Sequence, residues 1–165
     1  MRNAQRILAL QRKQASRSKQ PPNVPLELRT VPINELPGAV QQLLETTPLQ
    51  LREDLIEQLV WAVKSKNEFV KDRAWICLVS LGGVAVSAIG EQLLHQHRDT
   101  RYRLRLIYLL GEIGQQHREA MAPLLHLLSA TKVPEILAAA TSTLMGITAG
   151  QPVLGEGSPG ILPGL

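Results

Sequence analysis

The 165-residue chain has few aromatic residues and a single cysteine. Its five Phe, Trp and Tyr residues stand beside a hydrophobic content of 44%, so leucine and alanine must fill most of the core. This composition favours stacked helices over a β-sandwich, because strands are enriched in aromatic and β-branched residues. The single cysteine, Cys77, excludes a disulfide framework and a thiolate zinc site, and it fits a reducing compartment.

Long hydrophobic runs are also missing. No stretch approaches the roughly 20 apolar residues of a membrane-spanning helix, and the N-terminus lacks the long apolar core of a secretory signal peptide. We therefore expect a cytoplasmic protein with no membrane span. Organellar targeting stays open, because residues 1–26 are rich in arginine, contain serine and hold no acid, as transit peptides do.

Positive charge is concentrated at the N-terminus. Residues 1–34 carry seven Lys or Arg and one acid, a net charge of +6, whereas residues 35–165 carry eleven basic and thirteen acidic residues. Any attraction for nucleic acid or an acidic surface is therefore expected in a basic arm, residues 1–19. If the arm is helical, four basic side chains share one stripe: Arg2, Arg6, Lys13 and Arg17. A disordered, solubilising tail is the alternative.

Proline and glycine divide the rest of the chain. Residues 20–34 are proline-rich and predict an extended linker, partly in the polyproline II conformation. Residues 150–165 are rich in glycine and proline and predict a flexible tail. Residues 35–149 predict a helical domain with breaks at proline, glycine and polar residues. We expect its helices at 34–46, 49–66, 69–82, 84–97, 99–114, 117–130 and 133–147.

The predicted helices pair into units of similar length, 49–83, 84–116 and 117–149. A fixed period of about 30–35 residues is typical of an α-solenoid. The stretch DTRYRLRLIYLLGEIG, residues 99–114, resembles the second helix of a short, bacterial-type HEAT-like repeat, with its Asp turn, hydrophobic–Arg pair and Leu-Gly-x-Ile-Gly ending. AMAPLLHLL, residues 120–128, resembles the usual first helix. The resemblance implies an all-α fold, a short α-solenoid of about three HEAT-like hairpins with flexible arms.

Such a resemblance specifies a fold and not an activity. It implies a non-enzymatic interaction scaffold, adaptor or assembly subunit that binds a partner protein through its concave helix face and repeat ends. The chain has no Gly-rich phosphate loop, Gly-x-Ser-x-Gly elbow or repeated His-Glu dipeptide, so we expect no catalytic residue, cofactor or metal ligand. The alternatives are a nucleic-acid-contacting subunit that uses the basic arm, and a lyase-like accessory or chaperone subunit.

Within helix 99–114, Arg103 falls inside the apolar arc. A charge in that position must be paired, and Asp99 lies beside it, one turn earlier. The resemblance implies an Asp–Arg ladder between repeats, so we expect Arg103 and Asp99 to be structural residues.

The opposite strip of this helix carries two arginines, an aromatic residue and an acid: Arg101, Arg105, Tyr108 and Glu112. In solenoids of this type, second helices line the concave surface, so the strip would face the groove. Arg and Tyr are enriched among interface hot spots. We expect the strip to bind a partner, with a solvated helix face as the alternative.

Two further surfaces are candidate contacts. Trp61 lies opposite the apolar face of helix 49–66 and either marks an interface or is covered by the preceding helix or linker. The last helix carries Ala138 and Ser142 on the side away from its core, and Glu135 is its only charge. Terminal repeats usually show water a polar face, so we expect a second protein to stack there. The alternative is that the C-terminal tail folds back onto this helix.

Overall fold

A computed structural model of the chain describes residues 4–9, 12, 21–95 and 98–150, and its long elements are all helices. No β-strand occurs in these residues, which confirms the expected all-α class. Residues 4–9 are also helical. The remaining elements are, in chain order, η1 (Leu26–Leu28), η2 (Ile33–Glu35), α2 (Leu36–Thr46), α3 (Leu49–Ala62), α4 (Glu68–Leu81), α5 (Gly83–His95), α6 (Thr100–Gly114), η3 (Arg118–Ala120), α7 (Met121–Ala130) and α8 (Pro134–Ala149).

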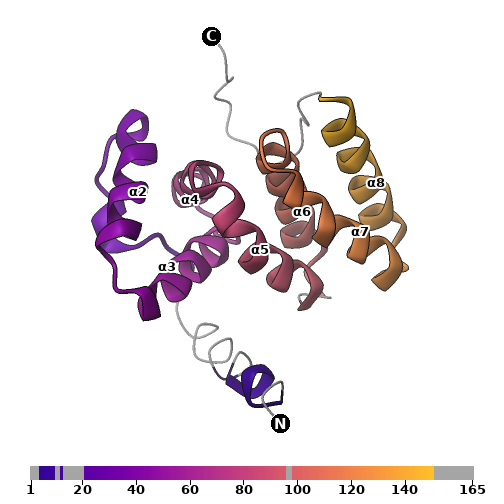
Figure 1. Cartoon of the computed structure of the whole chain (residues 1–165), viewed down its shortest axis with the longest axis horizontal. Coiled ribbons are helices and arrows are strands. Elements are labelled where there is room, and N and C mark those ends of the chain that lie inside the picture. The colour runs from indigo at the N-terminus through magenta and orange to yellow at the C-terminus, as the bar shows by residue number, and fades with distance from the viewer. Residues whose placement is uncertain (1–3, 10–11, 13–20, 96–97, 151–165) are drawn as a thin grey trace.

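The helices form two rows (Figure 1). In the first row α2, α4, α6 and α8 lie side by side, and in the second row α3, α5 and α7 do so. The rows also contact each other, as where α3 packs on α4, α5 on α6 and α7 on α8. Consecutive helices therefore alternate between the rows, and the chain advances along the array from α2 to α8.

Two helices of the first row begin at equivalent caps. Asn67 precedes α4, and its Oδ1 accepts a hydrogen bond from the backbone N–H of Phe69 at 3.0 Å. Asp99 precedes α6, and its Oδ1 accepts one from the N–H of Tyr102, also at 3.0 Å. Each bond satisfies a backbone donor that the first helical turn leaves without a partner. The caps lie 32 residues apart, the same separation as the starts of α4 and α6.

Glycine ends α4 and permits close packing of the turn. Gly82 has φ +61°, in the left-handed region that L-residues rarely adopt. A Cβ atom built there would lie 2.5 Å from Nε2 of His117. Gly82 therefore provides both the backbone conformation and the space that the α4–α5 turn requires.

Leucine dominates the core between the rows, as the small number of aromatic residues predicts. Leu59, Leu78, Leu106 and Leu109 have no exposed surface, and burying each contributes on the order of 2 kcal/mol. Trp75 is also in the core, where it is 1% exposed.

The proline-rich segment before α2 packs against the domain instead of merely connecting to it. Val24 and Leu28 are buried in the main core, whereas Leu26 is exposed. One guanidinium nitrogen of Arg73, Nη1, donates to the carbonyls of Leu28 (3.0 Å) and Val31. The predicted flexible tail lies outside the described residues except for Gly150.

Candidate functional site

The expectation that Arg105 faces solvent is wrong. Its side chain is 9% exposed, and its Nη1 donates hydrogen bonds to the carbonyls of Val63 at 2.9 Å and Ser65 at 3.1 Å. These carbonyls lie just beyond the C-terminus of α3, where the last turn leaves acceptors unpaired. The Tyr102 hydroxyl donates a hydrogen bond to a third backbone carbonyl, that of Val60 in the last turn of α3, at 3.1 Å. Arg105 therefore joins α6 to the end of α3.

Arg73 makes the same kind of contact one period earlier. It lies 32 residues before Arg105, on α4 instead of α6, and it too bridges two carbonyls of the preceding segment with one nitrogen. The caps Asn67 and Asp99 have the same separation. No local pattern in the sequence distinguishes Arg73, although aligning the two caps matches it with Arg105.

Arg103 is buried, at 2% exposed, but Asp99 does not pair with it. Oδ1 of Asp99 accepts the N-cap hydrogen bond, and Oδ2 lies 3.5 Å from Nζ of Lys64. Burial lowers the pKa of Arg103 from its ordinary value, and its Nε has no hydrogen-bond partner. The expected Asp99–Arg103 pair is thus replaced by a capping interaction and a contact with Lys64, just beyond the end of α3.

The rest of the predicted partner-binding strip on α6 is only partly accessible. Arg101 is exposed, and Tyr108 is half-buried against the core. Oε2 of Glu112 accepts a hydrogen bond from Nε1 of Trp75 at 3.0 Å, which holds the carboxylate against α4. Partner binding by these residues stays a prediction.

Charged side chains gather where α4 and α6 approach each other. The ammonium of Lys71 is buried and contacts the carboxylates of Glu68 (2.5 Å) and Asp72 (3.6 Å). The hydrogen bond from Lys71 and then its charge lower the pKa of Glu68, and Arg105 and Arg101 add to this. Burial raises the pKa of Asp72, although the charge of Lys71 opposes that shift. Both ion pairs of Lys71 lie within α4, and the arginines of α6 act on these carboxylates only through their charge.

Trp61 is half-buried, and the residues that cover it come from α6 and the end of α3. Its ring meets that of Tyr102 edge to face, with centroids 6.1 Å apart. Nζ of Lys64 lies 4.7 Å from the indole centroid, a cation–π contact. The indole Nε1 is buried without a hydrogen-bond partner. An interface role for Trp61 stays a prediction.

The outer face of α8 matches the expectation from its sequence. Ala138 and Ser142 are exposed, and Met145 is 66% exposed, whereas Ile136 and Ala140 are fully buried on the other side. Figure 1 shows α8 at the end of the array. The tail residues that would fold back on it lie outside the described part of the chain. We call the exposed residues Ala138, Ser142 and Met145 the α8 end face.

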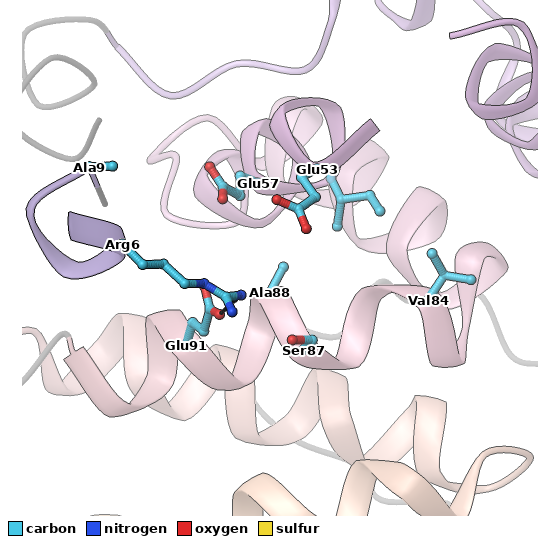
Figure 2. Close-up of a pocket in the computed structure, with 9 residues that line it drawn as sticks. Arg6, Ala9, Glu53, Glu57, Val84, Ser87, Ala88 and Glu91 are labelled. Carbon is cyan, nitrogen blue, oxygen red and sulfur yellow. Dashed lines mark ion pairs between the residues drawn. The ribbon is translucent and has the colours of Figure 1, made fainter. Parts of the chain in front are cut away.

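One residue of the predicted basic stripe can be placed. Nη2 of Arg6 lies 3.7 Å from Oε1 of Glu91 on α5, and Figure 2 shows Arg6 reaching across a pocket toward that carboxylate. Arg2, Lys13 and Arg17 lie outside the described residues. Arg6 thus contacts an acid of its own chain, and binding of nucleic acid or an acidic surface stays a prediction.

Cys77 is buried, and burial raises the pKa of its thiol to about 12. In the described part of the chain, no three His, Cys, Asp or Glu side chains lie close enough together to hold a metal ion. Within the same residues, no helix is long and apolar enough to cross a membrane.

Comparison with known proteins adds no family. A scan against protein-family models, a search of curated proteins and a search of solved structures each found no match. The placement of the chain's own side chains is therefore the basis for a functional assignment.

Proposed function

We propose that the chain is a short α-solenoid of HEAT-like repeats and acts as a non-enzymatic interaction scaffold or assembly subunit. The alternation of helices between two rows supports this interpretation. So does the 32-residue recurrence of a capping residue, Asn67 and Asp99, and of a carbonyl-binding arginine, Arg73 and Arg105. Repeat units that stack by nearest-neighbour contacts form elongated surfaces suited to binding other proteins.

The α8 end face is the observation that carries this proposal. A terminal helix that no further unit covers normally presents polar side chains to water. Here Ala138 and Ser142 are small, Met145 is 66% exposed, and the polar groups beside them are the hydroxyls of Thr141 and Ser142; Glu135 is the only charged residue of α8. Small side chains permit close helix approach, and methionine adapts to varied apolar surfaces. A helix or helical hairpin of another protein would therefore continue the array beyond α8.

The exposed part of α6 provides a second contact in this proposal. Arg101 projects into solvent, Tyr108 is partly accessible, and Trp75 holds Glu112 in place. Arginine and tyrosine contribute strongly at interfaces when their surroundings exclude water. In the first row α6 is the helix next to α8. A partner bound to α8 can therefore also reach α6.

Ala138→Glu tests the proposal, because it places a charge in the centre of the α8 end face. Ala122→Glu is the matched control, since Ala122 is exposed on α7. Tagged full-length proteins would be purified from the source cells, with co-purifying proteins identified by mass spectrometry and the complex sized by light scattering. We expect Ala138→Glu to lose its stoichiometric partner and Ala122→Glu to keep it, with unchanged helicity by circular dichroism in both.

A complex that Ala138→Glu leaves intact would contradict stacking on α8. The ratio of absorbance at 260 nm to that at 280 nm in the same preparation reports bound nucleic acid. A high ratio that falls after nuclease treatment, with no protein partner present, would favour the basic-arm alternative.

A further inference from the structure

A groove runs between α3 and α5 on the second row of helices. It has a volume of about 280 Å³, and the N-terminal helical residues 4–9 lie over one end of it. Figure 2 shows carboxylates on both walls, with Glu53 and Glu57 on α3 and Glu91 on α5. The groove is therefore acidic, and the described segment that approaches it carries a guanidinium.

The chain's own helix occupies this groove only lightly. Its Arg6 side chain is 70% exposed even while it contacts Glu91 at 3.7 Å. Its apolar residues Ile7 and Leu8 are each 53% exposed and are not among the residues that line the groove. An exposed ion pair contributes little to stability, so the contact between Arg6 and Glu91 holds residues 4–9 only weakly.

The other end of the groove offers an apolar contact that residues 4–9 do not use. Val84, on α5, is 59% exposed and lies at the opposite end of the pocket from Arg6 (Figure 2). Ile56 is buried beneath the groove, and Ala88 forms part of its lining. Val84 and Glu91 are seven residues apart, which corresponds to about 10.5 Å along a helix. A bound helix with a basic and an apolar residue at that spacing would engage both ends.

We propose that the α3–α5 groove is a docking site for a basic amphipathic helix of a partner protein, and that residues 4–9 are a resident helix that this partner displaces. The charges are complementary, because the groove has three carboxylates and the resident contact is made by an arginine. Val84 lies at the end of the groove away from residues 4–9, so a ligand must be longer than the resident helix to contact both Val84 and Glu91. The surface lies on the second row, so the inference does not depend on binding at the α8 end face.

The resident helix can be located by a spin label in the full-length protein. Gln5→Cys provides an exposed attachment site, whereas the native Cys77 is buried and does not compete for the label. We expect paramagnetic broadening of the backbone signals of Ala88 and Glu91 that disappears when the label is reduced. The charge reversal Glu91→Arg should weaken this broadening. Undiminished signals along α5 in the labelled wild-type chain would overturn the placement of the resident helix.

Binding in trans can be tested with an alanine-based helical peptide that carries an arginine and a leucine seven residues apart. Titrated into the spin-labelled chain, it should restore the α5 signals as it displaces residues 4–9. Fluorescence anisotropy should show at least fivefold weaker peptide binding with Val84→Ser or Glu91→Gln, and weaker binding at higher salt. Leu125→Ser is the matched control, because it also removes an exposed apolar side chain, but from α7.

Several results would refute docking in this groove. The peptide should bind the Ala138→Glu variant normally, since that substitution lies on α8. Equal affinity for wild-type protein and Glu91→Gln would show that the peptide binds elsewhere, and the proposal would fail. Equal affinity for the peptide and one with glutamate in place of arginine would also refute it. Failure of the peptide to bind, with the resident helix in place, would refute a docking site for partner helices.

Discussion

Replacing Arg105 by alanine should destabilise the fold and not act as a surface substitution. Arg105 is 9% exposed, and its guanidinium donates to the carbonyls of Val63 and Ser65. Alanine removes both hydrogen bonds and leaves two carbonyls at the end of α3 in a poorly hydrated site. A hydrogen bond from a charged donor contributes about 1.5–3 kcal/mol. Because a single nitrogen serves both acceptors, and some water can enter, we expect a loss of about 3 kcal/mol.

Thermal unfolding followed by circular dichroism measures this loss. For a domain of this size a change of 1 kcal/mol shifts the melting temperature by about 4 °C, so Arg105→Ala should melt roughly 12 °C below the wild-type chain. Arg105→Met retains the apolar stem without the donors and separates hydrogen bonding from packing. If the hydrogen bonds to the carbonyls dominate, Arg105→Met should lower the melting temperature almost as much as Arg105→Ala does.

The control is Arg101→Ala on the same helix. Arg101 is exposed, and substitutions at such positions usually change the free energy of unfolding by less than about 0.5 kcal/mol. If Arg105→Ala melted as close to wild type as Arg101→Ala does, the contacts of Arg105 would have no structural role. Arg105 would then contribute no more to stability than the exposed Arg101.

Three other predictions concern packing and ionisation. Gly114→Ala should lower stability by about 1–3 kcal/mol, because the new Cβ would lie 2.5 Å from Cδ1 of Ile147. Adding Ile147→Val removes that methyl group but leaves Cγ1, which would lie 2.8 Å from the new Cβ, so it should restore only part of the melting temperature. Burial raises the pKa of Cys77 to about 12, so at pH 8 iodoacetamide should label the thiol only as fast as the chain opens, as judged by mass spectrometry. Lys71 lowers the pKa of Glu68 from 4.5, so the stabilising contribution is present above pH 4.5 and lost below it. In urea titrations the advantage of wild type over Glu68→Gln should therefore vanish as the pH falls.

The helical class and the approximate helix bounds could be predicted because their signals are local. Apolar residues recur at helical spacing, and polar or glycine residues mark the ends, as Asn67 and Asp99 do at the starts of α4 and α6. The exposure of Ala138 and Ser142 on α8 followed from the same periodicity. In these cases the direction of the Cα–Cβ bond decides what the side chain faces.

Burial could not be predicted for residues whose surroundings depend on a long side chain or on a distant segment of the chain. A helical projection places Arg105 opposite the apolar arc, but its flexible stem lets the guanidinium reach the end of α3. The burial of Leu28 depends on contacts with helices that follow later in the chain, which proline content does not reveal. Arg6 meets Glu91 across 85 residues of sequence, and no pattern within either segment predicts that contact.

Because several basic side chains are buried, the composition of the chain overstates the positive charge on its surface. Of the eleven basic residues in 35–165, four are buried: Lys71, Arg73, Arg103 and Arg105. Only seven others remain to balance the twelve acidic residues of the helical domain, 35–149, so its surface is more negative than its net charge of −1 suggests. Phosphate would be repelled by such a surface, whereas a basic helix would be attracted. The net charge of +4 therefore describes two oppositely charged parts of one chain, and Arg6 on Glu91 is a point at which they meet.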